Sequence, residues 1–388
     1  MRILVAAERL GHAGGMERYL EIILPTLVGR GATVHVVARE IDAVPRGMTA
    51  ETIAWADEHA APAVNARAAM RRAVTAFAPD VAVAHNVMDA GIVETLRTVR
   101  RFAYHVHDHR PFCPNGDRIF PRSGRICTLP IGRACAVHSL TDGCGYGPRR
   151  RTLTLIRRRE RLRDAIAAAD VAIVASGYVR ERALANGVPA DRIVEIPLPL
   201  PDGAYAAHGH ARTSRTVLFA GRIVPQKGLR SLIRAIALIA PEERPSVRAF
   251  GDGPDLGAAR DDAANRGVVL DAKGAVAPEA LRAAIDDAAL VAIPSLWAEP
   301  FGYVGIEAFA RGRTVVAYDV GGVRAWLADG RSGVAVPRGD EAALAAAIAA
   351  LLRDDRRRSA LAECARREAE RFRARVIVDA LLSAYKAR

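Results

Sequence analysis

The chain has 388 residues, too many for one ordinary globular domain and enough for two domains that each bury a core. Hydrophobic residues make up 51% and charged residues 26%, proportions that exclude a disordered chain and a small disulfide-stapled scaffold. The formal net charge of +13 predicts attraction to anions, whether phosphate-bearing substrates, anionic lipid headgroups or nucleic acid, and charge alone does not choose among them.

No apolar run approaches the roughly 20 residues that a helix needs to cross a bilayer. The longest, from Ala342 to Leu352, is closed by charged residues. The run from Ile3 to Ala7 is short for the core of a signal peptide and is better interpreted as a first buried strand. We therefore expect a cytoplasmic protein.

Short runs rich in Val and Ile alternate with longer helical patterns along the whole chain, which is typical of parallel βαβ units. In the first half we predict strands at residues 3–7, 34–38, 81–84, 102–106, 171–175 and 193–196. In the second half we predict strands at residues 216–220, 247–250, 268–270, 290–293, 315–317 and 334–336. This pattern predicts an α/β fold with two Rossmann-like, doubly wound domains.

Proline and glycine between residues 197 and 203, followed by a polar stretch from His208 to Thr213, indicate a linker between the domains. We place the N-terminal domain at residues 1–204 and the C-terminal domain at residues 205–371. Residues 372–388 show helical spacing and are predicted to form a helix that packs back on the first domain. Ligands of open α/β sheets bind beyond the carboxyl ends of the strands, so we expect the chemistry in a cleft lined by the loops of both domains.

The first predicted strand is followed by Gly11, Gly14 and Gly15 and then by a helical pattern. A glycine-rich turn before a helix lets backbone amides approach an anion or a sugar at the positive end of the helix dipole. The spacing is not the regular dinucleotide-binding one, and a turn that needs positive φ explains these glycines equally well.

Four of the five cysteines, Cys113, Cys127, Cys135 and Cys144, fall in a loop-rich segment at residues 109–150. They contain no C-x-x-C pair, so reduced thiols are the simplest interpretation and a structural zinc ion is the alternative. The next stretch, from Arg149 to Arg163, has eight arginines in fifteen residues with apolar residues at helical spacing. It predicts an amphipathic helix whose basic face is either simply solvated or in contact with an anionic membrane surface or a phosphorylated acceptor.

The second domain opens with two cations, Arg222 and Lys227, on the loop after its first predicted strand. A diphosphate needs partners of this kind. A second tight turn, from Gly251 to Pro254, is expected to form part of the cleft floor. Further on, Glu299 follows a buried strand, and Glu307 lies in the helix that Gly302 begins. Carboxylates accept paired hydrogen bonds from vicinal hydroxyls, and the start of that helix offers free N–H groups to a phosphate.

These segments together resemble the retaining, nucleotide-sugar-dependent glycosyltransferases of family 4, which have the GT-B fold. The resemblance covers nearly the whole chain and rests on five motifs: the Gly14-Gly15 turn, A-G-R-x-x-x-Q-K-G at 220–228, the turn at 251–254, E-P-F-G-x-x-x-x-E at 299–307, and D-V-G-G at 319–322.

The resemblance implies roles for individual residues. Arg222 and Lys227 would bind the donor diphosphate, Glu299 the transferred sugar and Glu307 the ribose. Gly15, Gly251, Phe301, Gly302 and Tyr303 would line the donor site, with backbone amides from Phe301 to Val304. The family pattern also places a histidine at the end of the fourth strand, facing the donor sugar. His107 matches it, and His105 and His109 are expected to have no catalytic role.

The expected enzyme moves a sugar from a nucleoside diphosphate to a glycan or lipid-linked acceptor of the cell envelope, with retention of configuration. The chain has no D-x-D pair to hold a metal bridging a diphosphate, so we expect no metal or other cofactor to be required. A GT-B nucleotide-sugar epimerase or hydrolase is the alternative. A nucleic-acid-binding protein is a weaker one, because aromatic stacking motifs are missing beside the arginine clusters.

Overall fold

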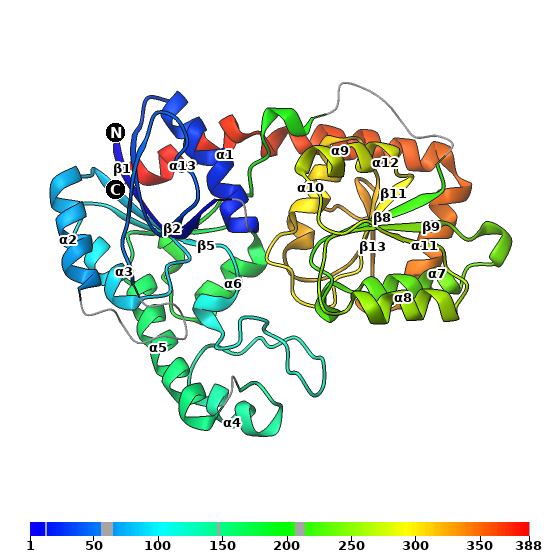
Figure 1. Ribbon diagram of the computed structural model, residues 1–388, viewed down its shortest axis with the longest axis horizontal. Helices are drawn as coiled ribbons and strands as arrows, with labels where there is room; N and C mark the ends of the chain where they lie inside the picture. Colours follow the sequence, from blue (N-terminus) through cyan, green and yellow to red (C-terminus); the bar gives the residue numbers. More distant parts are fainter. Residues whose placement is uncertain (12–13, 56–64, 146–147, 206–213, 388) are drawn as a thin grey trace. The chain divides into compact units, whose positions relative to one another are not determined.

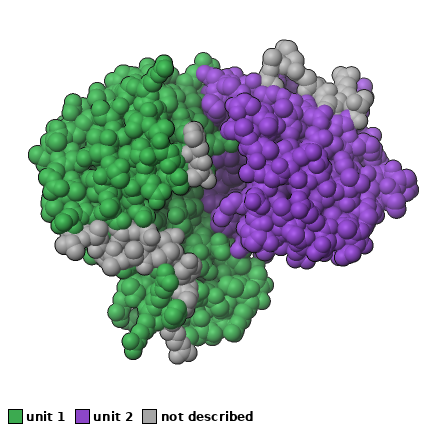
Figure 2. Space-filling model, viewed as in Figure 1, with its two compact units in different colours: residues 1–199, 374–388 green, residues 200–373 purple. Residues whose placement is uncertain are grey.

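The structure is a computed structural model that describes residues 1–11, 14–55, 65–145, 148–205 and 214–387 (Figure 1). The chain divides into two compact units (Figure 2). Unit 1 comprises Met1–Pro199 and Ala374–Arg388, and unit 2 comprises Leu200–Arg373. The units therefore divide five residues before the boundary predicted at 204/205. The predicted linker stretch from His208 to Thr213 lies outside the described residues.

Unit 1 is built on a seven-stranded parallel sheet with strand order β3-β2-β1-β4-β5-β6-β7. The strands are β1 (Arg2–Leu10), β2 (Thr33–Ile41), β3 (Thr49–Thr52), β4 (Val81–His85), β5 (Phe102–Val106), β6 (Val171–Val174) and β7 (Ile193–Glu195). Every residue of β4, β5 and β6 is buried, as expected of a parallel sheet with both faces covered.

The helices of unit 1 are α1 (Gly15–Gly29), α2 (Ala66–Phe77), α3 (Ala90–Leu96), α4 (Arg133–Thr141), α5 (Arg149–Ala167), α6 (Gly177–Ala185) and α13 (Ala374–Lys386). Alternation along β1 sends Leu4 into the core on one face of the sheet and Ile3 into the core on the other. Helix α13 contributes Leu381 to the same core as Ile3, so the end of the chain packs within unit 1.

Unit 2 has a six-stranded parallel sheet with strand order β10-β9-β8-β11-β12-β13. The strands are β8 (Thr216–Ala220), β9 (Ser246–Phe250), β10 (Leu270–Ala272), β11 (Leu290–Ile293), β12 (Val315–Tyr318) and β13 (Gly333–Val336). The helices are α7 (Leu229–Ala237), α8 (Leu256–Asn265), α9 (Pro278–Asp287), α10 (Tyr303–Ala310), α11 (Glu341–Arg353) and α12 (Asp355–Ala369). The predicted class of two doubly wound domains is confirmed.

Two strands differ from the prediction. Strand β3 was not predicted, because its sequence T-A-E-T lacks an apolar run. The predicted strand at 268–270 begins at Leu270 instead. Val268 lies three residues past the end of α8 and takes part in the C-terminal cap of that helix: its N–H donates to the carbonyl of Ala263 at 2.9 Å, and Gly267 has a φ of +62°. Pairing with β9 therefore starts later than the apolar pattern suggests.

Helix α5 is amphipathic as predicted, with Leu155, Leu162 and Ile166 buried. Its basic side is not wholly solvated, since Arg159 is buried and Arg161 forms a two-point ion pair with Glu94 of α3. Within the described part of the chain, no helix combines the length and apolarity that membrane crossing requires.

Candidate functional site

The loops after β8 and β9 of unit 2 interlock through glycines. A Cβ on Gly251 would lie 1.9 Å from the carbonyl oxygen of Gly221, and Gly251 has a φ of +123°. The N–H of Gly221 donates to the carbonyl of Phe250 at 3.0 Å, and that of Ile223 to the carbonyl of Asp252 at 2.8 Å. Only glycine fits at position 251, and the two loops form one fixed surface at the carboxyl end of the sheet.

The two predicted phosphate-binding cations lie on the loop after β8 in different environments. Arg222 is exposed and has no ion-pair partner among the residues that the structure describes. Lys227 ends a short 3-10 turn before α7, and Gly228 after it has a φ of +76° and would clash with the carbonyl of Pro294 if it carried a Cβ. The N–H of Leu296 donates to Gln226 at 2.8 Å, which holds this loop against the segment after β11.

That contact brings Lys227 to Glu299, 72 residues later in the chain. The Lys227 ammonium donates to Glu299 Oε1, and the Ser295 hydroxyl donates to the same oxygen at 2.7 Å. The Lys227 Nζ also lies 5.1 Å from the centre of the Trp297 ring. Glu299 is only 4% exposed, so its charge is balanced inside the protein rather than by water.

The pKa of Glu299 is set by opposing effects. Burial by itself raises the pKa, but the charge and hydrogen bond of Lys227, with the hydrogen bond from Ser295, outweigh burial and leave the pKa below its ordinary value. Glu299 is therefore ionised at neutral pH. It can accept hydrogen bonds from hydroxyl groups, and it is not poised as a general acid.

Helix α10 starts directly after this pair. Gly302 precedes it with a φ of +101°, and the first turn leaves its N–H groups at the positive end of the helix dipole. The Phe301 side chain is 1% exposed, and its carbonyl accepts a hydrogen bond from the Trp326 indole at 2.7 Å. Phe301 thus anchors the start of α10 in the core, and any contact it makes with a ligand must come from its backbone.

Glu307 lies one turn into α10, four residues after Tyr303, and is 3% exposed. A carboxyl in that position needs polar neighbours, because an isolated buried charge is strongly unfavourable. The predicted ribose-binding role of Glu307 stays a prediction.

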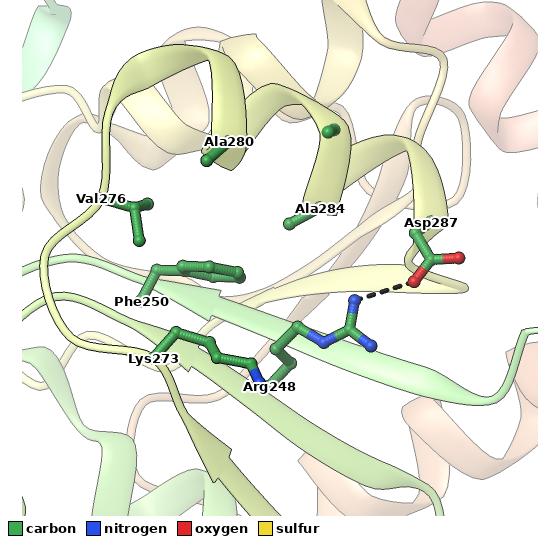
Figure 3. A pocket seen from close by; sticks show the side chains of 8 residues that line it. Arg248, Phe250, Lys273, Val276, Ala280, Ala284 and Asp287 are labelled. Carbon is green, nitrogen blue, oxygen red and sulfur yellow. Dashed lines mark hydrogen bonds and ion pairs between the residues drawn. The ribbon is translucent and has the colours of Figure 1, made fainter.

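A cavity of about 440 Å³ lies next to Phe250, the last residue of β9 (Figure 3). Its wall includes Phe250, which directly precedes Gly251, and Lys273 at the end of β10. The opposite wall is α9, where Asp287 accepts a hydrogen bond from Arg248 at 2.8 Å. The cavity is thus largely apolar with a few charged groups at its margin, a composition that suits small organic ligands.

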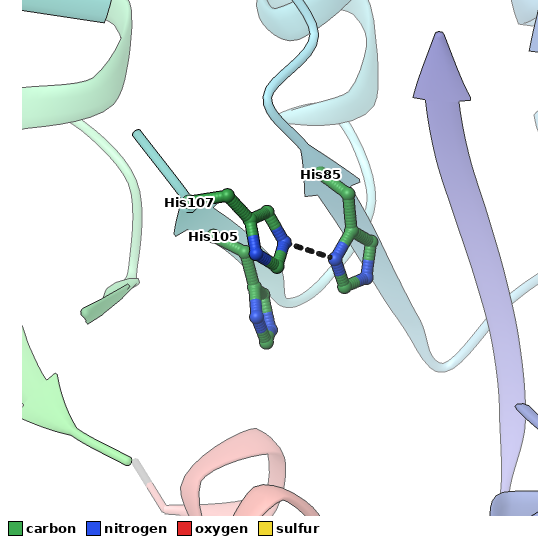
Figure 4. A group of neighbouring side chains, drawn as sticks. All are labelled: His85, His105 and His107. Carbon is green, nitrogen blue, oxygen red and sulfur yellow. Dashed lines mark hydrogen bonds between the residues drawn. The ribbon is translucent and has the colours of Figure 1, made fainter. Parts of the chain in front are cut away.

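In unit 1, His107 lies just past the end of β5 and forms a cluster with His85 and His105 (Figure 4). His85 ends β4, and the register pairs it with His105 of β5. His85 Nδ1 and His107 Nε2 are 2.9 Å apart and share a hydrogen bond. The ligand atoms of all three rings lie within 4.8 Å of one another.

The nitrogens of His105 face two tyrosines. Its Nε2 lies 2.8 Å from the hydroxyl of Tyr385 in α13, and its Nδ1 lies 3.4 Å from that of Tyr19 in α1. With the bond between His85 and His107, four of the six ring nitrogens take part in contacts within the unit, and these contacts compete with metal coordination. The predicted absence of a metal at the site stays a prediction.

Burial lowers the pKa of His107 to about 4, an effect that Asp108 opposes and Arg110 reinforces. Burial also lowers the pKa values of His85 and His105 well below the usual range. The three rings are therefore neutral at neutral pH, and each can both donate and accept a hydrogen bond.

Asn86 helps to position this cluster. It has a φ of +49°, and its side-chain Oδ1 accepts a hydrogen bond from the N–H of His107 at 3.0 Å.

Gly15, the predicted ligand contact after β1, is the first residue of α1 and is exposed. Residues 12–13 of the same turn lie outside the described residues.

Sequence reasoning missed several of these neighbours. His85 had a signal, because it directly follows the predicted strand at 81–84, which precedes the predicted strand that carries His105 in the chain. Ser295 and Trp297 also lay inside the segment that contains Glu299. Tyr385 had no local signal, since it reaches His105 across 280 residues.

Known proteins share both units. Residues 13–201 match Glycosyltransferase Family 4, and residues 205–368 match Glycosyl transferases group 1. The chain belongs to the family 4 glycosyltransferases of the GT-B type. The phosphatidyl-myo-inositol mannosyltransferase of Mycolicibacterium smegmatis is 32% identical over 205 residues, which cover 52% of this chain and 50% of that protein. The D-inositol 3-phosphate glycosyltransferase of Rhodococcus opacus is 35% identical over 198 residues, which cover 48% of this chain and 44% of that protein.

The chain thus spans about half the length of these relatives. Among solved structures, Anabaena HepE in complex with UDP has a TM-score of 0.74 at 19% identity, with 99% of each chain covered. WaaG, a glycosyltransferase involved in lipopolysaccharide biosynthesis, has a TM-score of 0.69 at 14% identity, with both chains fully covered. The family 4 glycosyltransferase described here therefore has the GT-B fold throughout.

Proposed function

We propose that this family 4 glycosyltransferase transfers a hexose from a nucleoside diphosphate sugar to an acceptor hydroxyl, with retention of the anomeric configuration. The observation that carries the proposal is the arrangement at the carboxyl end of the unit 2 sheet. The neighbouring strands β9, β8 and β11 end there. Arg222 and Lys227 follow β8, and Glu299, which pairs with Lys227, follows β11 together with the start of α10. The Gly251 turn follows β9.

The charges in this arrangement suit a diphosphate and a sugar. Arg222 is available to an anion, and Lys227 keeps two N–H bonds after it donates one to Glu299. The N–H groups at the start of α10 add a third positive feature for the leaving diphosphate. Glu299 is ionised and accepts hydrogen bonds from sugar hydroxyls, while Glu307 on the same helix is assigned to the ribose.

The cavity beside Phe250 is assigned to the nucleobase. It offers an aromatic wall together with Lys273 at its margin. The complex of Anabaena HepE with UDP supports a nucleotide ligand for proteins of this fold. If the assignment is right, Phe250→Ala weakens binding of UDP or GDP more than binding of inorganic pyrophosphate.

Retention of configuration is proposed without a protein nucleophile. Glu299 is held by Lys227 and Ser295 in a position where its charge is already neutralised, which makes it a poor nucleophile. The acceptor then attacks on the face from which the phosphate leaves, and the leaving phosphate takes the proton of the acceptor. His107, neutral because burial lowers its pKa to about 4, serves as a hydrogen-bonding partner of the donor sugar.

The acceptor is proposed to be a lipid-linked or other cell-envelope glycan bound by unit 1 in the cytoplasm. The basic helix α5 carries exposed arginines and an exposed Leu153, a composition that favours contact with an anionic membrane surface. The names of the mannosyltransferase and inositol phosphate glycosyltransferase relatives are consistent with a phosphorylated or lipid-borne acceptor.

The test of nucleotide binding at the donor site is calorimetric titration of the purified chain with UDP, GDP and ADP, in buffer with excess chelator.

The test of catalysis is a turnover assay of variants. Lys227→Ala and Glu299→Gln should reduce turnover at least 100-fold, or about 2.7 kcal/mol of transition-state stabilisation. Arg353→Met is the matched control, because Arg353 also forms an ion pair in unit 2 but on α11, with Glu243. Wild-type turnover in the Glu299 variant would refute the assignment.

Product analysis separates transfer from the alternative activities. A labelled sugar that appears on a polyprenyl or inositol phospholipid supports the transferase, whereas free sugar or an epimerised donor supports a hydrolase or an epimerase. Failure of every nucleoside diphosphate to bind would contradict the donor site itself.

A further inference from the structure

The segment between β5 and α5 has little regular secondary structure. It contains a 3-10 turn (Arg110–Phe112), an isolated antiparallel bridge between Ile119 and Ile126, and the short helix α4. None of the residues of α4 is fully buried, and Val137 and Leu140 on it are exposed. In the described part of the segment, the buried apolar side chains include Phe112, Phe120 and Ile131, so apolar contacts away from α4 hold the segment in part.

Four cysteines of this segment surround one small cavity of about 30 Å³, which we call the cysteine pocket. The residues that line the pocket are the four cysteines Cys113, Cys127, Cys135 and Cys144, the polar residues Asn115, Arg118 and His138, and the apolar residues Pro114, Ile119, Phe120 and Leu129. Each cysteine comes from a different piece of chain: the turn after the 3-10 helix, the end of the bridged hairpin, the first turn of α4 and the segment after α4. The secondary structure of the segment does not explain why four of the five cysteines line the same pocket.

One buried side chain, that of Arg118, lines the pocket and contacts the backbone around it. The Arg118 side chain is 1% exposed, and it donates to the carbonyls of Phe112, Cys127 and Leu129 at 3.2, 3.0 and 2.7 Å. Arg118 thus ties together the chain on either side of the pocket.

We propose that the cysteine pocket binds one structural Zn²⁺ ion through its four thiolates. Zinc bound in structural sites takes four ligands in a tetrahedron, with sulfur at about 2.3 Å, and four cysteines are a common set. A cavity of this size holds a single ion and no larger group. Because the ion would link four separate pieces of chain, it would add to the stability that the few buried apolar side chains of the segment supply.

Side-chain rotation is needed to close the site. Among the described residues, the histidine cluster is the only group of three or more potential ligands close enough together to hold a metal ion as they stand, so the cysteine side chains are not yet in a metal-binding arrangement. Two of them are turned to other acceptors: the Cys113 Sγ donates to Asn115 Oδ1 at 2.9 Å, and the Cys135 Sγ lies 4.0 Å from the carbonyl of Pro130. Loss of the thiol proton abolishes both hydrogen bonds and frees these sulfurs to turn toward the pocket.

Burial raises the pKa of Cys113 and Cys135, and it raises that of Cys144 to about 12, so without metal these groups are neutral thiols at neutral pH. Binding therefore releases protons to solvent as the thiolates form. His138, which also lines the pocket, is engaged through Nδ1 with Asp142 at 2.7 Å. The four sulfurs are consequently the preferred ligands.

The test is the metal content of the intact chain, purified without chelator or a polyhistidine tag from cells supplied with zinc. We expect about one zinc per chain by elemental mass spectrometry. After denaturation without reductant, all five cysteines should react with an alkylating reagent, since none is in a disulfide. A mercurial should release zinc to a colorimetric chelator as the pocket thiols react.

Cys364→Ser is the matched control, because Cys364 lies on α12 of unit 2, beside Arg367, and should leave the zinc content unchanged. Cys127→Ser and Cys144→Ser should each lower it at least tenfold. Measurements on the wild-type protein do not depend on whether a cysteine variant folds. Three results on it would overturn the proposal: a zinc content near zero, iron in place of zinc, or disulfide bonds among the pocket cysteines.

Discussion

Replacing Lys227 by methionine tests the electrostatics of unit 2 directly, because it leaves the buried Glu299 charge without its main partner. Loss of one member of a buried ion pair typically costs 3–5 kcal/mol of unfolding free energy. The Lys227 side chain is 21% exposed and that of Glu299 6% exposed, so water reaches the site from the lysine side only. We therefore expect the lower end of this range, about 3 kcal/mol at neutral pH.

The loss should depend on pH. In the wild type, Lys227 and Ser295 hold the Glu299 pKa below its unfolded value, so this carboxylate stabilises the fold above the unfolded pKa, and the contribution is lost as pH falls through the folded pKa. In Lys227→Met, the hydrogen bonds from Ser295 and Trp297 remain, but without the lysine charge we expect burial to prevail and to raise the Glu299 pKa above the unfolded value. The unfolding free energy of the variant then falls as pH rises from the unfolded to the folded pKa of Glu299. The difference in unfolding free energy between wild type and variant is therefore largest near neutral pH and becomes smaller toward about pH 5.

Urea unfolding followed by tryptophan fluorescence measures this gap. Of the three tryptophans, Trp297 and Trp326 belong to unit 2 and Trp55 to unit 1, so a Trp55→Phe background isolates the transition of unit 2. Adding Glu299→Gln to Lys227→Met should recover more than half of the loss, because no unpaired charge remains. An equal loss at both pH values, or a double variant no more stable than the single one, would refute the reasoning.

Three further predictions concern single residues. Arg222→Met should leave the unfolding free energy within about 0.5 kcal/mol of wild type while weakening UDP or GDP binding at least tenfold by calorimetry; a loss of stability without loss of affinity would contradict the phosphate role. Gly251→Ala should cost about 1–3 kcal/mol in urea unfolding, because its Cβ would meet the carbonyl of Gly221, and an unchanged midpoint would argue against the interlocked loops. His85→Ala should lower kcat about tenfold with little change in KM, because His107 loses the hydrogen bond that orients its ring; an unchanged kcat would dismiss that role.

Much of the fold followed from the sequence because each buried parallel strand is a short apolar run that stands out from the helices around it. The same local logic placed Arg222, Lys227 and Glu299 on loops at the carboxyl ends of strands. What it did not reveal was that Lys227 and Glu299 are bonded to each other, since that contact depends on the packing of two loops and on side-chain rotamers. The predicted donor, acceptor and catalytic roles remain for experiment.

The partners of His107 were harder to foresee for a related reason. His85 reaches it across adjacent strands, and the hydroxyl of Tyr385 reaches the cluster from the far end of the sequence. Such contacts depend on tertiary packing, on which local periodicity carries no information. The start of β10 was misplaced because Val268 serves the end of a helix although it has the composition of a strand residue.

The placement of α13 has a consequence for the order in which the protein matures during synthesis. All residues of unit 2 are contiguous, so it can close its core as soon as residue 373 has left the ribosome. Unit 1 begins to emerge first but lacks Leu381 and Tyr385 until α13 is made, and Tyr385 binds a histidine beside His107. Unit 1 is therefore completed only after the whole of unit 2 has been synthesised, and its histidine cluster gains the Tyr385 contact at that point.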